Sequence, residues 1–272
     1  MSFLTPPEQG WRRYVAIGDS FTEGMSDVDP SDPNAFIGWA DRLAAMLHDR
    51  AAAAGGGLEY ANLAIRGRKL DDVVGRQLDA ALSLQPDLVS MVGGGNDFLR
   101  PRADLDDLAQ RLEDAVVRLR GAGVDVLLAT PTDPRDAPLL SAVRGRHATH
   151  SANLWSIARR HGCALIDQWG LRALQDFRVW SEDRIHMNSE GHRRVALAAY
   201  TALGYTPDDA DWETPLPPAP PLPRAERLRG DRAWARVYVV PWVGRRLTGR
   251  SSGDGREAKR PRPDVPRTNP AR

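Results

Sequence analysis

Short apolar runs alternate along the chain with longer segments in which apolar residues recur every three or four positions. The apolar runs predict buried β-strands at residues 14–17, 58–64, 88–92, 124–129 and 164–167. The periodic segments predict amphipathic helices at residues 36–47, 69–84, 104–120, 138–161 and 189–203. Strands that alternate with helices of this length form right-handed βαβ units. The pattern therefore predicts an α/β fold, a three-layer α/β/α sandwich with a central parallel sheet.

The alternation stops near residue 205, and the remaining chain has a different composition. Seven prolines between residues 207 and 223 are typical of a stiff, extended connector. It leads to a basic, aromatic segment that we expect to pack on or near the main body. Beyond residue 250 almost nothing is apolar, which predicts disorder. The predicted organisation is a domain at 1–205, a Pro-rich linker with a basic aromatic segment at 206–250, and a disordered basic tail at 251–272.

The net charge of +1 hides an uneven distribution of charge. Residues 1–223 hold 23 basic and 31 acidic side chains, whereas residues 224–272 hold 14 basic and 5 acidic ones. Because Trp234, Tyr238 and Trp242 lie among these arginines, one hypothesis is that residues 224–272 bind nucleic acid or an anionic membrane surface. The alternative, which we favour, is that the basic segment docks on the acidic body of the same chain.

Other features of the sequence exclude several classes of protein. The single cysteine, Cys163, excludes an internal disulfide framework and fits a reducing compartment. Its apolar neighbours favour a buried thiol over a reactive one. The N-terminus lacks the basic and apolar regions of a secretory signal, and no run of about 18 apolar residues predicts a membrane span. We therefore expect a cytoplasmic location.

Ser20 stands where the first predicted strand leaves the sheet, directly after Gly18 and Asp19. In open α/β sheets, ligands bind outside the carboxyl ends of the strands. Ser20 is therefore a candidate nucleophile. The alternative is that Asp19 and Ser20 only cap a turn, which both residue types often do.

Later turns contain the other groups that a serine nucleophile needs, which are a base, an acid that orients the base, and donors for an oxyanion. Asp183 and His186 are three residues apart, so the carboxylate can reach one imidazole nitrogen while the other faces Ser20. Asn96 follows three glycines and can present a side-chain amide, and Gly67 can present a backbone N–H. Each residue alone is equally explained as a cap, an exposed histidine or a turn residue. Their combination favours catalysis.

Together these segments resemble the four sequence blocks of the SGNH, or GDSL, hydrolase superfamily, over roughly residues 11–205. The matching strings are Gly18-Asp19-Ser20-Phe21, the turn at Gly67, Gly94-Gly95-Asn96-Asp97 and Asp183-x-x-His186. The resemblance implies a flavodoxin-like α/β/α fold. It also implies that Ser20 is the nucleophile, that Asp183 and His186 complete the triad, and that the oxyanion hole consists of the Ser20 amide, Gly67 and Asn96. Asp19 is then an orienting residue beside the nucleophile.

The implied activity is that of a serine esterase or acylhydrolase, which cleaves a small-molecule carboxylic ester through an acyl-enzyme without a cofactor or metal. The sequence specifies neither the acyl chain, the alcohol, a preference between ester and thioester, nor the oligomeric state. Arg68 follows Gly67 where the family commonly has an acidic or amide residue, and Phe21 stands in place of a leucine. With Arg66 and Lys69, Arg68 forms either a basic rim for a negatively charged substrate or an ordinary solvated turn.

Two other kinds of site are disfavoured. His147, His150 and His161 lie on one predicted helix, but no Glu-x-x-His motif or cysteine accompanies them, so a solvated helix face is favoured over a metal site. The order Ser, Asp, His also occurs in α/β-hydrolases, but the Gly-x-Ser-x-Gly elbow of those enzymes is absent around Ser20.

Overall fold

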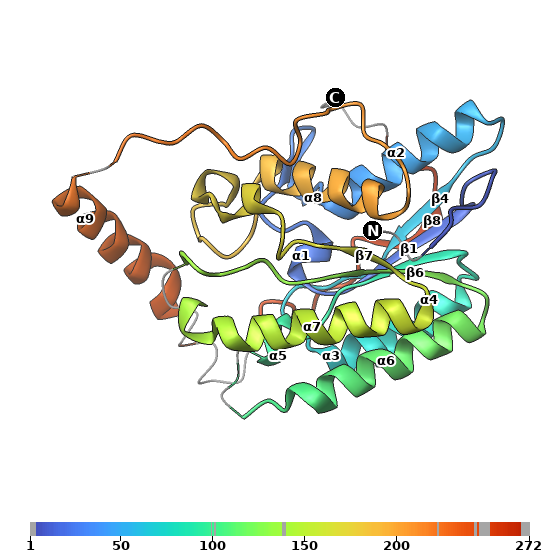
Figure 1. Ribbon diagram of the computed structural model, residues 1–272, viewed down its shortest axis with the longest axis horizontal. Coiled ribbons are helices and arrows are strands. Elements are labelled where there is room, and N and C mark those ends of the chain that lie inside the picture. Colours follow the sequence, from blue (N-terminus) through green and yellow to red (C-terminus); the bar gives the residue numbers. More distant parts are fainter. Residues whose placement is uncertain are drawn as a thin grey trace.

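The computed structural model describes residues 4–98, 100, 102–137, 140–221, 223–241, 244 and 251–267. A six-stranded sheet with the order β7-β6-β5-β1-β4-β8 forms its centre (Figure 1). The predicted strands are present as β1 (Arg13–Ile17), β4 (Glu59–Asn62), β5 (Leu88–Met91), β6 (Asp125–Ala129) and β7 (Ala164–Ile166). These five strands pair in parallel, which confirms the predicted α/β fold.

Helices cover both faces of the sheet (Figure 1). One face carries α2 (Trp39–Ala53) and α8 (Ser189–Ala202). The other carries α3 (Leu70–Asp72), the π-helical turn η1 (Val73–Gln77), α4 (Leu78–Ser83), α6 (Leu105–Gly121) and α7 (Arg144–His161). Along β1, Tyr14 and Ala16 belong to the first core, whereas Val15 and Ile17 belong to the second. Successive side chains of a strand point to opposite faces, so one continuous apolar run serves both cores.

Shorter elements surround the carboxyl ends of the strands and the sheet edge. They are α1 (Ser20–Glu23), β2 (Val28–Asp29), β3 (Asp32–Phe36), α5 (Gly95–Phe98), and the 3₁₀ turns η2 (Leu140–Val143), η3 (Arg172–Gln175) and η4 (Phe177–Val179). After the connector come α9 (Arg224–Trp234) and the π-helical turn η5 (Ala235–Val239). In the described part of the chain, none of the helices is long and apolar enough to cross a bilayer.

The strand order creates a crevice at the carboxyl end of the sheet. From β1 the chain crosses to β4 on one side and then returns to β5 on the other side of β1. The segments that leave β1 and β5 therefore diverge toward opposite faces, and in open α/β sheets such a switch point is where ligands bind. Ser20 follows β1 and Asn96 follows β5. The topology thus places two of the predicted site residues at this switch point.

The prediction that residues 251–272 are disordered is wrong for residues 251–267. β8 (Arg260–Asp264) pairs antiparallel with β4 and forms one edge of the sheet. The pairing contains an irregularity, because Arg260 lies opposite Asn62 and Asp264 opposite Tyr60, so that four steps of β8 span two steps of β4. Pro261 and Pro263, which have no N–H to donate, lie between these paired positions. Backbone pairing to an open sheet edge therefore orders a segment that has almost no apolar side chains. Residues 268–272 of the predicted tail lie outside the described part.

Ion pairs add to the attachment of this C-terminal segment. The Lys259 ammonium donates to the carbonyl oxygens of Glu23 and Phe36, at 2.5 and 3.1 Å, and lies 2.6 Å from Asp41 Oδ2. These contacts tie the segment to the chain on either side of β2 and β3.

The basic aromatic segment contacts the body through fewer residues than its composition indicates. Trp234 and Tyr238 reach the loop that contains Asp183, whereas the side chains of Val237 and Val240 are more than half exposed. Trp242 and Val243 lie outside the described residues. Cys163 is buried, as predicted.

Candidate active site

Ser20 begins α1 directly after a tight exit from β1. A Cβ atom on Gly18 would lie 2.8 Å from the carbonyl oxygen of Val92, so only glycine fits between the ends of the two strands. The side-chain amide of Gln77 braces this exit, because its Oε1 accepts from Gly18 N at 2.8 Å and its Nε2 donates to Gly18 O at 3.0 Å. Asp19 caps α1, and its Oδ1 accepts from Phe21 N at 3.1 Å. Asp19 therefore caps the helix, while Ser20 lines the crevice beside it.

Asp183 and His186 lie in one tight loop before α8. Ser181 N donates to His186 O at 2.8 Å, and Trp180 and Met187 form an antiparallel bridge that closes the loop. Asp183 Oδ1 accepts from Ser181 Oγ at 2.6 Å and from the backbone N–H groups of Ile185 and His186, both at 2.9 Å. These bonds fix the carboxylate before it contacts the imidazole.

His186 bridges the loop and the first strand. Its Nδ1 lies 2.6 Å from Asp183 Oδ2, and its Nε2 lies 3.0 Å from Ser20 Oγ. Because a carboxylate only accepts, Nδ1 carries the proton, which leaves the Nε2 lone pair for the Ser20 hydroxyl. The structure thus brings the three residues into a hydrogen-bonded chain, although Ser20 and His186 are 166 positions apart.

The Asp183 carboxyl group stays ionised in this setting. Burial by itself would raise its pKa, but the hydrogen bond from the His186 ring, the electrostatic attraction of His186, and the bonds from the His186 backbone and Ser181 outweigh burial and hold the pKa below its ordinary value of 3.8. An ionised carboxylate keeps the proton on Nδ1 of His186 and stabilises the imidazolium that forms when Nε2 accepts a second proton.

Asn96 lies in α5, across the switch point from Ser20. Its Nδ2 donates to Arg68 O at 2.9 Å and to Asp19 Oδ2 at 3.2 Å, so both amide hydrogens have partners. The bond to Asp19 is the longer of the two. The neighbouring Asp97 accepts from Leu70 N at 2.8 Å and so joins this turn to the start of α3.

Replacing Asn96 by alanine is expected to lower kcat for ester hydrolysis by about 10²- to 10³-fold with little change in KM, since an oxyanion donor acts mainly in the transition state. Thermal unfolding measured in parallel separates this effect from loss of the Asn96–Arg68 bond. Asn34→Ala, in β3, serves as the control. A loss of less than about tenfold would contradict the oxyanion role of Asn96.

Asp19 is buried beside these groups, and burial is the main cause that raises its pKa from 3.8 to about 6, although the hydrogen bond from Phe21 N and the charge of His186 oppose the rise. A carboxyl group whose pKa is higher in the folded than in the unfolded state binds more protons when folded. Its contribution to stability is therefore unfavourable above pH 6 and becomes more favourable as the pH falls toward 4.

The Asp19→Asn variant tests this linkage because it cannot titrate. Between pH 7.5 and pH 4, we expect the free energy of unfolding of the wild type to rise by about 2 kcal/mol relative to the variant, given the pKa of about 6 for Asp19. Urea unfolding of both proteins across this range measures the difference. Parallel pH profiles for the two proteins would show that Asp19 titrates normally.

Gly67 lies in the turn after β4, with a positive φ of 72°. Among the described residues, neither its N–H nor that of Ser20 has an acceptor, so both remain available to a ligand. Gly67 is nevertheless not part of the lining of the cavity described below. A Cβ on Gly67 would clash with Ser251 Oγ, which also donates to Gly67 O at 3.3 Å. The structure therefore covers one side of this turn with the C-terminal segment.

Arg66 fits neither the basic rim nor the solvated turn that the sequence left open around Gly67. Arg66 is buried and forms an ion pair with Glu23 of α1, and Glu23 Oε2 also accepts from Arg66 N at 2.6 Å. This pair binds the turn at Gly67 to the helix that carries Ser20. The pair is not visible in the sequence, because no local pattern links the two residues.

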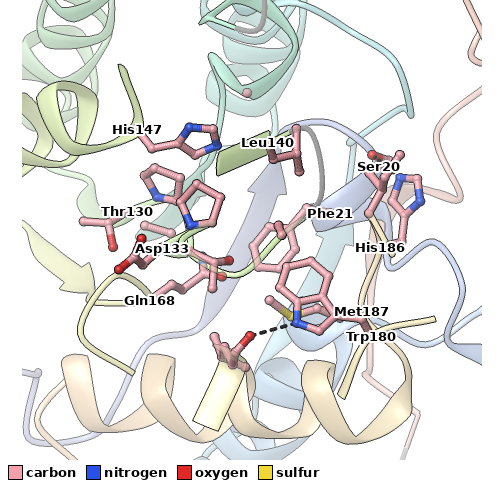
Figure 2. A pocket seen from close by; sticks show the side chains of 18 of the residues that line it. Ser20, Phe21, Thr130, Asp133, Leu140, His147, Gln168, Trp180, His186 and Met187 are labelled. Carbon is pink, nitrogen blue, oxygen red and sulfur yellow. Dashed lines mark hydrogen bonds between the residues drawn. The ribbon is translucent and has the colours of Figure 1, made fainter. Parts of the chain in front are cut away.

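A cavity of about 230 Å³ opens beside the Ser20 hydroxyl. Figure 2 shows Ser20 and His186 at one end, with Phe21, Leu140, Trp180 and Met187 along the apolar walls. The Phe21 ring stacks on Trp39 and on His192, and its centroid lies 5.6 and 5.9 Å from theirs. Phe21, which stands in place of a leucine, is therefore part of the cavity wall. Apolar side chains therefore border much of the space next to Ser20.

His147 and His150 are buried at the cavity rather than on a solvated helix face, so that expectation is wrong. His161 lies at the other end of α7, 2.7 Å from Glu113. Among the described residues, no three His, Cys, Asp or Glu side chains converge in a way that could hold a metal ion.

Comparisons with known proteins agree with this geometry. The model of the GDSL-like lipase/acylhydrolase family matches residues 16–194, which include all of the catalytic candidates. A search of curated proteins found no significant match. An α/β hydrolase from the metagenome of Lake Arreo, Spain, is 26% identical, with a TM-score of 0.60 over 75% of this chain and 98% of that chain. An acetylxylan esterase from Geobacillus stearothermophilus is 19% identical, with a TM-score of 0.60 over 77% and 100% of the two chains. The chain therefore belongs to the GDSL-like lipase/acylhydrolase family.

Proposed function

We propose that the chain hydrolyses small-molecule carboxylic esters through a covalent acyl-enzyme formed on Ser20. Family membership makes the chain a serine-dependent carboxylic ester hydrolase. The observation that best supports the residue roles is the position of His186, whose two ring nitrogens lie 3.0 Å from Ser20 Oγ and 2.6 Å from Asp183 Oδ2. A serine, a histidine and a carboxylate linked in this order form a catalytic triad. The histidine activates the serine as a nucleophile, and the carboxylate stabilises the histidine.

In the first half-reaction, His186 Nε2 removes the proton from Ser20 Oγ as the oxygen attacks the ester carbonyl carbon. The resulting imidazolium is stabilised by Asp183, which remains ionised. The negative charge that develops on the carbonyl oxygen is met by the free N–H groups of Ser20 and Gly67 and by the amide of Asn96. His186 then returns its proton to the departing alkoxide, and the acyl group remains on Ser20.

In the second half-reaction, water takes the place of the alcohol. His186 removes a proton from this water, which attacks the acyl carbon, and the carboxylic acid leaves as Ser20 regains its proton. All steps use side chains and backbone groups of this chain. Asn96 exchanges its longer bond, to Asp19, for the oxyanion at each attack.

The cavity supports small substrates. A cavity of about 150 Å³ is large enough for benzene, so the 230 Å³ next to Ser20 has room for a somewhat larger group. Hydrolysis of an ester panel from acetyl to long-chain acyl groups, with Ser20→Ala as the blank, tests the function. We expect kcat/KM to be highest for short chains. Hydrolysis of only long-chain esters would contradict this proposal.

The second hypothesis, binding of nucleic acid or an anionic membrane surface through residues 224–272, has less support. Trp234 and Tyr238, two of the three aromatic side chains on which this hypothesis depends, donate hydrogen bonds to the loop that contains Asp183. Docking of the segment on the body of the same chain accounts for these contacts. A liposome-pelleting assay on the full chain would detect binding to an anionic membrane surface, and a filter-binding assay would detect binding to nucleic acid.

A further inference from the structure

The end of the cavity farthest from Ser20 differs from its apolar walls. Figure 2 shows that this end is formed by Thr130, Asp133, His147 and Gln168. A polar end in a mostly apolar cavity is typical of a site that orients its ligand with a few hydrogen bonds.

Gln168 has unused hydrogen-bonding capacity at this end. The residue is only 4% exposed, and no hydrogen bond joins its side-chain amide to another described residue. Neither amide atom is among the fully buried side-chain atoms without a partner, so the amide borders open space instead of being sealed in the core. Gln168 also lines the cavity, so its amide is accessible to a bound molecule.

His147 provides a second open position. Its Nδ1 lies 3.0 Å from Val143 O, and because a carbonyl oxygen only accepts, Nδ1 carries the proton. Nε2 then holds a lone pair, and no described group donates to it. Burial lowers the pKa of His147 below 6.5 and keeps the ring neutral, although the bond to Val143 O opposes this.

Asp133 and Thr130, the other two groups at this end, already have partners, whereas the buried Nδ1 of His150, one turn along α7 from His147, has none among the described residues. Arg144 donates to both Asp133 oxygens, at 2.7 and 2.9 Å, and so neutralises the carboxylate. Thr130 Oγ1 accepts from Trp169 N at 3.0 Å and lies 3.4 Å from Ile166 O. The open positions are therefore a neutral amide and a neutral imidazole acceptor. This pair complements a hydroxyl group, which both donates and accepts hydrogen bonds. A carboxylate or phosphate would have no cationic partner here, because Arg144 already pairs with Asp133.

We propose that Gln168 and His147 form a subsite for a hydroxyl group of the substrate. The assignment rests on the proposed function, because it places the ester at Ser20 and the hydroxyl at the opposite end of the cavity. The hydroxyl belongs to the part of the substrate that fills the cavity, either the acyl group or the alcohol. In both cases the preferred substrates are short, hydroxylated esters.

Two matched pairs of esters test the subsite and distinguish its two sources. The acyl pair is p-nitrophenyl hexanoate and its ω-hydroxy analogue, and the alcohol pair is cyclohexyl acetate and the corresponding hydroxycyclohexyl acetate. The wild type is expected to prefer the hydroxylated member of one pair by about tenfold in kcat/KM, because a site built for a hydroxyl group rejects its apolar analogue. The pair that shows the preference identifies the part of the substrate in the cavity.

Gln168→Leu has nearly the same size as the native residue and is expected to abolish this preference. His147→Phe keeps the edge contact with Phe98 and is expected to weaken it. Gln110→Leu, on the exposed side of α6, serves as the matched control and keeps the wild-type preference. If the esters are hydrolysed but the wild type shows no preference in either pair, the subsite proposal is wrong. It is also wrong if the preference persists in Gln168→Leu. If the wild type hydrolyses none of the four esters faster than Ser20→Ala, the proposed function itself fails.

A separate set of contacts joins the C-terminal extension to the catalytic loop. Trp234 Nε1 donates to the carbonyl oxygen of Asp183 at 2.8 Å, and Tyr238 OH donates to Glu182 Oε2 at 3.2 Å. Asp231 of α9 lies 2.7 Å from Arg184 Nη1, and the Arg184 guanidinium lies 5.0 Å from the Trp234 ring centroid. Three consecutive loop residues are thus bound by α9 and η5.

From these contacts we infer that Trp234 is a positioning residue for the triad, acting through the backbone of Asp183. This second inference also rests on the proposed function, since it assumes that Asp183 is the triad acid. Asp183 contacts His186 through its side chain and Trp234 through its carbonyl oxygen, so loss of the indole N–H frees one side of the loop. Displacement of a catalytic group by about 1 Å can cost up to 10²-fold in rate.

Trp234→Phe retains an aromatic ring but removes the N–H donor. We expect kcat for a short ester to fall about tenfold with KM unchanged. Trp212→Phe, in the connector of the same extension, is the control, because no described group accepts from its indole N–H. Asp231→Asn, which removes the charge that faces Arg184, is expected to lower kcat in the same direction. An unchanged kcat in Trp234→Phe, or an equal loss in Trp212→Phe, would overturn the positioning role. The Ser20→Ala blank, measured in parallel, shows whether the hydrolysis itself depends on the proposed triad.

Discussion

The Ser20→Ala variant is expected to retain less than about one part in 10⁴ of the wild-type kcat for a short-chain ester. The substitution removes only Oγ, the atom that lies 3.0 Å from His186 Nε2 and forms the bond to the acyl group. The cavity, the free N–H groups and Asn96 remain, so substrate binding is expected to change little. Steady-state hydrolysis of p-nitrophenyl acetate measures the loss.

Ser83→Ala is the matched control for this variant, because Ser83 ends α4 on the exposed surface and donates only to Ala80 O. Full activity in this control and near-complete loss in Ser20→Ala assign the effect to the nucleophile. Comparable activity in the two variants would mean that hydrolysis does not pass through Ser20.

His186→Ala is expected to lower kcat by a similar factor, about 10⁴ to 10⁶. Without the imidazole, no described side chain within hydrogen-bond distance of Ser20 Oγ can accept its proton, and the contact with Asp183 also disappears. Because the two residues act as one unit, the double variant Ser20→Ala/His186→Ala is expected to be no slower than either single variant. His161→Ala, at the far end of α7, is the control. Losses that multiply in the double variant would contradict a shared mechanism.

The parallel part of the fold is the part that the sequence predicts best. Each of its five strands is a short apolar run whose alternate residues enter two different cores, and such runs are visible without tertiary information. The exits from β1 and β5 are also visible, because glycines and short polar side chains interrupt apolar runs at Gly18 and Gly93. These two signals together located Ser20 and Asn96 at the same edge of the sheet.

The contacts that support the site are not visible in the sequence, because they join residues that are far apart in the chain. Gln77 braces Gly18 across 59 positions, and Glu23 binds Arg66 across 43 positions. A glutamine or a glutamate on a helix is ordinarily solvated, so its composition and spacing predict no such role. In the structure, the side chains of Gln77 and Glu23 are buried and hydrogen-bonded, which shows that they support the turns around Ser20.

The order of residues 251–267 in the C-terminal extension is also not visible in the sequence, for a related reason. Disorder is predicted from the scarcity of apolar residues, which assumes that burial of side chains is what orders a segment. In residues 251–267, pairing of β8 with β4 and the contacts of Lys259 supply the order instead. The same extension reaches both the turn at Gly67 and the loop at Asp183, so it lies beside the proposed catalytic groups rather than apart from them.

The most direct test of the central claim, that Ser20 is a nucleophile activated by His186, is the identification of the residue that a fluorophosphonate modifies. Incubation of the full chain with the reagent, digestion and peptide mass spectrometry locate the adduct. The proposed mechanism predicts a single adduct on Ser20 in the wild type and greatly slowed labelling in His186→Ala. An adduct on another residue, or an active enzyme whose Ser20 stays unmodified, would contradict it.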